Sequence, residues 1–120
     1  MPMNKFNTSP AEDRRYLGRT FGSKAEMRYA HLLEWWVSEG ILHTYICQPS
    51  TWLGVPENTF KPDFLVVPVG ATPHFVEVKG METGPWKRNK KLWAKYGRLP
   101  LHIVKARGAE KFETVEVIEP

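Results

Sequence analysis

Residues 24–39 show the clearest periodicity in the chain. Apolar side chains recur there every three or four positions, at Ala25, Tyr29, Leu32, Leu33 and Trp36. This spacing is typical of one buried helix face. Ser23 followed by Glu26 matches a capping box at the start of the run, and Gly40 is placed to end it. We therefore expect a helix from Lys24 to Glu39.

Shorter runs rich in β-branched and aromatic residues predict strands. They span residues 42–48, 64–69, 74–79, 101–106 and 112–118. The turn-like residues 70–73 favour a hairpin between the second and third of these strands. Pro85 near a first helical position and Gly97 at the end of an apolar pattern predict a second helix between them. Residues 49–60, with Pro, Gly and Asn, predict a long loop.

The predicted order is helix, three strands, helix, two strands (αβββαββ), which indicates an α/β fold with a mixed β-sheet flanked by helices. A chain of 120 residues has room for one core. We expect residues 21–120 to form this single domain and residues 1–20 to form a basic N-terminal arm. The first twenty residues contain no apolar run that would suit a signal peptide or a membrane span, and Cys47 is a lone cysteine, so we expect a cytoplasmic protein.

Candidate chemistry lies on the predicted hairpin. Pro62-Asp63 opens one strand, and Glu77-Val78-Lys79 ends the next, fourteen residues after the aspartate. Side chains alternate along a strand, so Glu77 and Lys79 project to one face and Val78 to the other. Asp63 shares the face of Glu77 if the register pairs it with Lys79 or another odd-numbered position.

Two carboxylates that converge repel each other unless a cation lies between them, and oxygen ligands suit Mg²⁺, with Mn²⁺ as a substitute. Such an ion polarises a phosphate oxygen and lowers the pKa of a bound water, while the Lys79 ammonium orients that water or offsets charge on the phosphorane. This is the chemistry of phosphodiester hydrolysis. Glu77-Val78-Lys79 alone also arises by chance in alternating strands, so its meaning depends on Asp63.

Glu26 has two compatible explanations. The capping box accounts for it without any chemistry. However, it also lies at the edge of the apolar helix face, next to Ala30, Leu33 and Val37, so its carboxylate leans toward the predicted sheet. We expect this carboxylate to assist at the same site.

Together these residues resemble the PD-(D/E)xK nuclease superfamily. The likeness rests on Pro62, Asp63, Glu77, Val78, Lys79 and Gly80, on a hairpin that follows a helix bearing Glu26. Residues 21–26, 61–64 and 86–96 also look like small phage endonucleases of the endonuclease I type of Holliday junction resolvase, and more closely like a short phage family of resolvase-like proteins. The similarity covers about residues 21 to 105.

The resemblance implies a restriction-endonuclease-like core and a role for each motif residue. Asp63 and Glu77 would be metal ligands, together with the backbone carbonyl of Val78. Glu26 would be a further carboxylate that reaches in from the helix, and Lys79 would be the catalytic lysine. The extended basic C-terminus of the endonuclease I proteins has no counterpart in this sequence.

A nucleic-acid partner is consistent with the charge of the chain. Seventeen basic residues against thirteen acidic ones give a net charge of +4. The second predicted helix concentrates basic side chains that would contact phosphates or, alternatively, only solvate its face: Lys87, Arg88, Lys90, Lys91 and Lys95. Trp52, in the long loop, is a candidate for stacking on bases or for a dimer contact.

The sequence therefore predicts a metal-dependent phage-type endodeoxyribonuclease that acts on DNA in the cytoplasm of an infected or lysogenic bacterial host. The form of DNA stays open between junction, flap, nick and duplex. The alternatives are a catalytically inactive nucleic-acid-binding domain of the same fold and a structural protein in which Asp63 and Glu77 lie apart. Junction resolution needs two symmetric cuts, so we expect a homodimer joined through the apolar residues of 49–60, unless that loop folds back over its own core.

Overall fold

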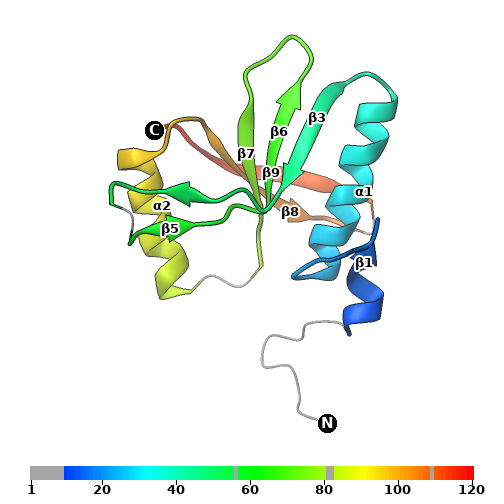
Figure 1. The fold of residues 1–120 in the computed structure, drawn as a ribbon, viewed down its shortest axis with the longest axis horizontal. Coiled ribbons are helices and arrows are strands. Elements are labelled where there is room, and N and C mark those ends of the chain that lie inside the picture. The colour runs from blue at the N-terminus through cyan, green and yellow to red at the C-terminus, as the bar shows by residue number, and fades with distance from the viewer. Residues whose placement is uncertain (1–9, 56, 81–82, 109) are drawn as a thin grey trace.

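A mixed β-sheet forms the centre of the molecule, with helices flanking it (Figure 1). The computed structural model describes residues 10–55, 57–80, 83–108 and 110–120. The strands of the sheet follow in the spatial order β3 (Leu42–Cys47), β6 (Phe64–Pro68), β7 (His74–Val78), β8 (Leu101–Ala106) and β9 (Phe112–Ile118). Only β7 and β8 run parallel, and the other neighbours are antiparallel. The expected α/β fold with a mixed sheet is confirmed.

Helix α1 (Lys24–Ser38) supplies much of the core on one side of the sheet. Its N-cap is Ser23, whose hydroxyl accepts a hydrogen bond from the Glu26 N–H at 3.1 Å. The helix packs against buried side chains at alternate positions of β6 and β7: Phe64, Val66, Val76 and Val78. This cluster therefore contains the apolar residues that recur at helical spacing in α1 and those that alternate along the two strands.

Helix α2 (Gly84–Tyr96) belongs to a second cluster of buried residues. It begins at the N-cap Thr83 and ends at Gly97, and Trp93 is its fully buried residue. Trp93 packs in one cluster with Leu101 of β8 and with Leu53 and Phe60 of the segment 49–60. Because α2 connects β7 to β8, it provides the crossover that a parallel strand pair requires.

The segment 49–60 is more structured than a loop. It forms a small hairpin of β4 (Thr51–Trp52) and β5 (Thr59–Phe60), in which Thr51 pairs with Phe60 and Trp52 with Thr59. Leu53 and Phe60 are buried against α2, whereas Trp52 and Val55 are exposed. The loop prediction was wrong here, because strands of two residues are too short to show periodicity. Two of its four apolar residues, Leu53 and Phe60, therefore pack into the chain's own core.

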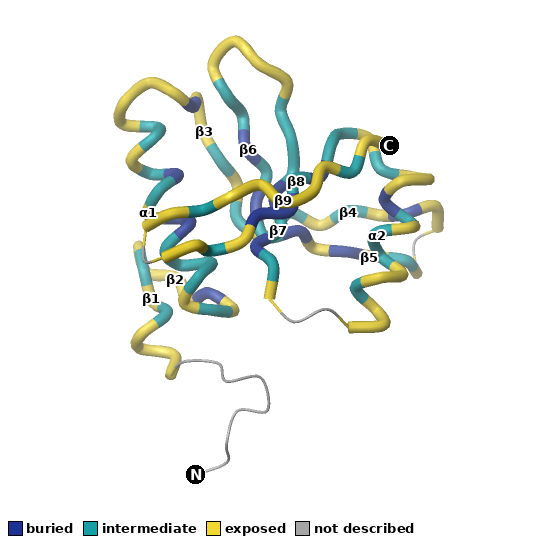
Figure 2. Tube along the Cα trace, turned by 180° about the vertical axis from the view of Figure 1, so that it is seen from behind, coloured by how far each residue is buried: buried dark blue, intermediate teal, exposed yellow. Residues whose placement is uncertain are grey.

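The described part of the N-terminal arm lies on α1 (Figures 1 and 2). It contains the 3₁₀ helix η1 (Ala11–Arg14) and a two-residue pair, β1 (Arg15–Tyr16) and β2 (Arg19–Thr20). The Tyr16 ring stacks on His31 of α1 with ring centroids 3.7 Å apart. Within the described residues, no helix has the length and apolarity needed to cross a membrane.

Trp93→Phe tests the packing on the α2 side. Trp93 is 1% exposed and its Nε1–H donates to the Leu99 carbonyl at 2.9 Å. The phenylalanine leaves that carbonyl unpaired and removes ring volume, so we expect the free energy of unfolding to fall by about 1–3 kcal/mol. Urea unfolding followed by circular dichroism measures this change. Trp35→Phe, at a tryptophan that is 55% exposed, should change it by less than about 0.5 kcal/mol.

Candidate active site

Asp63 and Glu77 face each other where β6 begins and β7 ends. The β6–β7 register pairs Phe64 with Val76 and Leu65 with Phe75, and its continuation sets Asp63 opposite Glu77. Two hydrogen bonds join the residues around this point. The Asp63 N–H donates to Glu77 Oε1 at 3.0 Å, and the Val78 N–H donates to Asp63 Oδ2 at 2.7 Å. The structure thus brings the two carboxylates together, as the motif predicts.

Glu26 joins this pair from the first turn of α1. Its carboxyl lies within hydrogen-bond reach of Asp63, of the Gly22 backbone and of Ser23. A Cβ added to Gly22 would lie 3.0 Å from Glu26 Oε1, so the absence of a side chain at Gly22 gives this carboxyl its place. The Glu26 N–H satisfies the Ser23 cap while its carboxyl turns toward Asp63. Glu26 therefore lies at the helix cap and also beside Asp63, so its position is compatible with both explanations.

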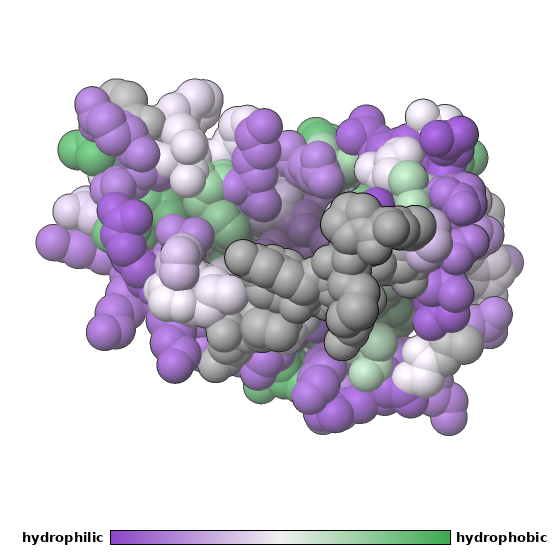
Figure 3. All heavy atoms as spheres, turned by 90° about the horizontal axis from the view of Figure 1, so that it is seen from below, coloured by the Kyte–Doolittle hydropathy of each residue, from purple (hydrophilic) through white to green (hydrophobic). Residues whose placement is uncertain are grey.

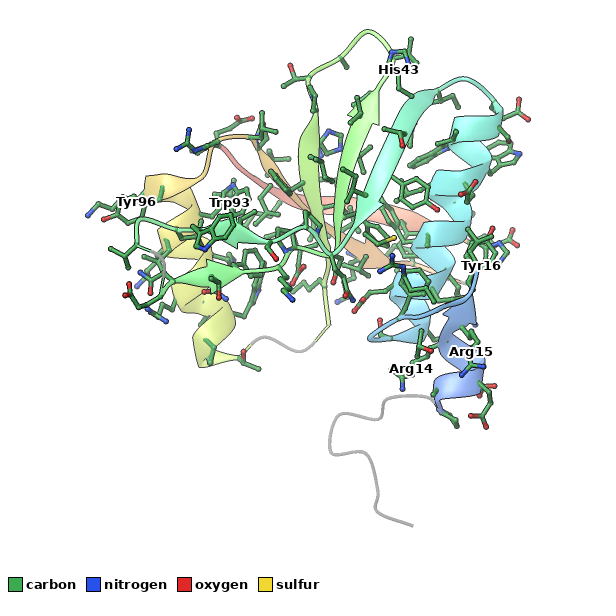
Figure 4. All side chains as sticks on the ribbon, in the orientation of Figure 1. Arg14, Arg15, Tyr16, His43, Trp93 and Tyr96 are labelled. Carbon is green, nitrogen blue, oxygen red and sulfur yellow. The ribbon has the colours of Figure 1, made fainter. Side chains whose placement is uncertain are left out.

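Arg14 is a residue of this region that the sequence did not reveal. Its Nη1 donates to the carbonyls of Phe21 and Gly22, at 2.7 and 3.2 Å, just before α1 begins (Figure 4). Its positive charge also lowers the pKa of Glu26, although less than the hydrogen bonds around that carboxyl do. The Arg14 Nε is buried without a hydrogen-bond partner among the described residues. Nothing in the sequence pattern signals this contact, because Arg14 lies in a segment without periodicity.

The electrostatics of the site reflect three acidic groups in one half-buried place. Burial raises the pKa of Asp63, and the neighbouring charges of Glu77 and Glu26 raise it further. Burial also raises the pKa of Glu77, to about 7, and that of Glu26. The backbone N–H of Val78 acts in the opposite direction on Asp63. The folded group therefore keeps protons to a higher pH than free carboxyls do.

Val78 and Lys79 complete the motif on the same strand end. The Val78 N–H points to Asp63, and the N–H and C=O of one strand residue face the same neighbour, so the Val78 carbonyl lies on the Asp63 side. The Lys79 N–H donates to the Val104 carbonyl at 2.7 Å, which extends the β7–β8 pairing by one residue. By alternation, Lys79 projects to the face of Glu77.

The donor set suits a hard divalent cation, because it consists of carboxylate oxygens and a backbone carbonyl. Within the described ranges, no group of three or more His, Cys, Asp or Glu side chains is arranged as a ready-made metal site. The oxygens of Asp63 and Glu77 instead accept hydrogen bonds from backbone N–H groups, and the two side chains also bond to each other. A cation would take the place of the carboxyl–carboxyl contacts.

The basic residues of α2 divide into two groups. Lys90 pairs with Glu116 of β9 at 2.8 Å, and Arg88 donates to Asn58 Oδ1 at 2.7 Å. The remaining three lie four residues apart on one helix row and are all exposed: Lys87, Lys91 and Lys95. Figure 3 views the molecule from the end at which β7 finishes, and hydrophilic side chains cover both flanks of that view. Trp52 lies apart from the carboxyl group, on the hairpin against the other end of α2.

Comparison with known proteins found no family model that matches the chain and no match among curated protein sequences.

The repulsion among the carboxyls predicts a stability that depends on pH. In EDTA, the folded protein holds protons on this group that the unfolded chain releases near pH 4. Stability should therefore fall as the pH rises from about 4 through the raised pKa of Glu77, about 7. Asp63→Asn keeps the shape and both hydrogen-bonding positions but removes one charge. We expect this variant to lose less stability than the wild type between pH 5 and pH 8.

Urea unfolding midpoints at the two pH values measure the effect. Glu57→Gln, at an exposed glutamate, is the control and should follow the wild-type dependence. An Asp63→Asn protein as pH-dependent as the wild type would show that the carboxyls do not interact.

Proposed function

We propose that this protein is a metal-dependent endodeoxyribonuclease of the PD-(D/E)xK class that hydrolyses DNA phosphodiester bonds. The observation that carries the proposal is the mutual placement of Asp63 and Glu77, whose side chains each accept a hydrogen bond from the other's strand end. Glu26 adds a third carboxyl from α1. A coincidental motif would leave these residues apart, so the geometry favours a built site over that alternative.

Mg²⁺ would be held by Asp63, Glu77 and the Val78 carbonyl, with Glu26 as a further ligand. When bound, it would supply Lewis-acid polarisation of the phosphate and stabilise hydroxide at neutral pH. The half-buried position of the three carboxyls strengthens their attraction for a cation, because the local dielectric constant is lower than that of water. Mn²⁺ has the same preference for oxygen ligands and would substitute.

The residues of the chain position and stabilise the reacting groups. In the hydrolysis, a water oxygen forms a bond to phosphorus, one P–O ester bond breaks, and the leaving oxygen takes up a proton. The Lys79 ammonium, on the face of Glu77, orients the water and offsets the negative charge that accumulates on the phosphorane. Arg14 acts indirectly, because it holds the Phe21–Gly22 turn against which the Glu26 carboxyl lies.

DNA would reach this site along α2. The exposed row of Lys87, Lys91 and Lys95 can contact successive phosphates, which position the duplex without reading its sequence. If the substrate is a four-way junction, two sites are needed, and a two-fold homodimer would supply them. A domain that binds DNA without cutting it is the alternative, and the cleavage experiment below separates the two.

The first functional prediction concerns the carboxylates and the lysine. Asp63→Asn, Glu77→Gln and Lys79→Met should each reduce Mg²⁺-dependent cleavage of DNA by at least about 100-fold, because each removes a metal ligand or a charge needed in the transition state. Initial rates on supercoiled plasmid and on labelled flap, junction and duplex substrates measure the loss. EDTA should abolish cleavage by the wild type.

Circular dichroism and DNA binding in EDTA are the controls, and the variants should retain both. Wild-type rates in Asp63→Asn or Glu77→Gln would contradict the assignment of the site. Binding without cleavage by the wild type in Mg²⁺ and in Mn²⁺ would favour the inactive binding domain instead.

The second functional prediction concerns salt. Replacing Lys87, Lys91 and Lys95 together by Gln should weaken DNA binding and lower the slope of log K against log salt by about 2–3, since each phosphate contact contributes about 0.9. Fluorescence anisotropy titrations across a range of NaCl concentrations give the slope. Lys90→Gln is the comparison: it should change the slope less than Lys91→Gln, because Lys90 pairs with Glu116. An unchanged slope in the triple variant would mean that this row is only solvated.

A further inference from the structure

Two large aromatic side chains remain in solvent beside the core on the α2 side. Trp52 is 62% exposed and Tyr96 is 39% exposed, although their neighbours Leu53 and Trp93 are each 1% exposed. Trp52 comes from β4 and Tyr96 from the last turn of α2, which Figure 4 shows at the end of the helix nearest the hairpin. Neither ring has a part in the carboxyl site, so their exposure needs another explanation.

Both rings line hollows in the surface. One hollow, of about 250 Å³, lies between the hairpin and the end of α2, and Trp52, Tyr96 and Arg98 are among its lining residues. The other, of about 340 Å³, is lined by the same three residues with Gly54 and Val55. Ligand pockets for drug-sized molecules span about 300–1,000 Å³, so both hollows lie at or below the lower end of that range and have the size for a single flat ring.

The backbone fixes Tyr96 in this position. Gly54 has φ +93°, and a Cβ added there would lie 2.8 Å from Tyr96 Cε2. The turn of the hairpin therefore lies directly against the tyrosine ring, which only a glycine permits. This contact joins the hairpin to the end of α2 and holds Tyr96 on the same side as Trp52.

The charge around the rings is positive. Lys95 Nζ lies 5.1 Å from the centroid of Tyr96, and Arg98 is exposed between the two hollows. Among the described residues that line them, none is acidic. Aromatic faces beside cations suit an anionic ligand with a flat ring, which is the chemistry of a nucleotide. A purely apolar partner would leave Arg98 and Lys95 without a role.

We propose that Trp52 and Tyr96 form a stacking subsite for an unpaired DNA base, with Arg98 and Lys95 on the adjacent phosphates. The inference rests on the proposed function and narrows its substrate. Bases within a duplex are already stacked and paired, whereas a single-stranded segment can place a base against these rings without the cost of unpairing it. The subsite therefore selects DNA with an unpaired strand, such as a flap or a branch, over plain duplex.

Binding of labelled oligodeoxythymidine and of a duplex of equal length, both in EDTA, tests the subsite. The proteins compared are the wild type, Trp52→Ala, Trp52→Phe and Trp35→Ala, the last at an exposed tryptophan of α1. We expect Trp52→Ala to weaken single-strand binding about 5- to 150-fold, the range of one stacked base, and to lower the preference for single strand over duplex. Trp52→Phe should recover most of the loss, and Trp35→Ala should show none. Oligodeoxythymidine should also quench tryptophan fluorescence in the wild type more than in Trp52→Phe.

The results that would contradict the stacking subsite differ from those that would contradict the proposed nuclease function. Equal losses for single strand and duplex in Trp52→Ala would mean that the ring does not stack, and urea unfolding would show whether the hairpin is disturbed. A dimer in light scattering that Trp52→Ala converts to a monomer, with unchanged single-strand affinity, would assign the surface to a second copy of the chain. If the wild type cleaves DNA while Trp52→Ala binds single strand as well as the wild type, the subsite fails and the nuclease stands. If Asp63→Asn cleaves as fast as the wild type, the assignment of the active site to the three carboxyls fails, whatever Trp52 does.

Discussion

The reciprocal hydrogen bonds between the ends of β6 and β7 determine where every other part of the site lies. The Asp63 N–H reaches Glu77, and the Val78 N–H reaches Asp63, so each carboxylate satisfies a backbone donor of the opposing strand. This pairing fixes the register, and the register sends Val76 and Val78 into the core on the α1 side. A slip of one residue would exchange the buried and exposed faces of the strand. Folding and the placement of the acidic residues therefore depend on the same contacts.

The same contacts have an energetic cost. Burial raises the pKa of each of the three carboxyls, and the charges of Glu77 and Glu26 raise that of Asp63 further, while the positive charge of Arg14 lowers that of Glu26. The apolar residues on either side of Asp63, Pro62 and Phe64, are fully buried and hold the strand end in position. A group of acidic residues that destabilises the fold and is held by its surroundings is characteristic of a functional site.

The sequence predicts those parts of the structure that follow from periodicity. The bounds of α1 and of the five strands of the sheet agree with the predictions to within one or two residues, because each element alternates or repeats over a length sufficient to reveal its period. The association of Asp63 with Glu77 was also predictable, since both residues lie on neighbouring strand ends. The β4–β5 hairpin, the contacts of Arg14 and the packing of Glu26 on Gly22 were not, because each depends on contacts between segments that have no period of their own.

These unpredicted segments pack on the two helices that flank the sheet. The arm from Ala11 to Thr20 packs on α1 and brings Arg14 to the turn that holds Glu26, while the β4–β5 hairpin packs on α2 and presents Trp52. In strands and helices, every second or every third to fourth side chain must be apolar and buried in the core, so fewer positions are available for polar or charged side chains. Short segments that pack on those elements are free of this restriction, so they can place a guanidinium or an indole where the sheet itself cannot. In this chain the sheet fixes the acidic group, and the irregular segments packed beside it place Arg14 at the Phe21–Gly22 turn and expose Trp52 on the α2 side.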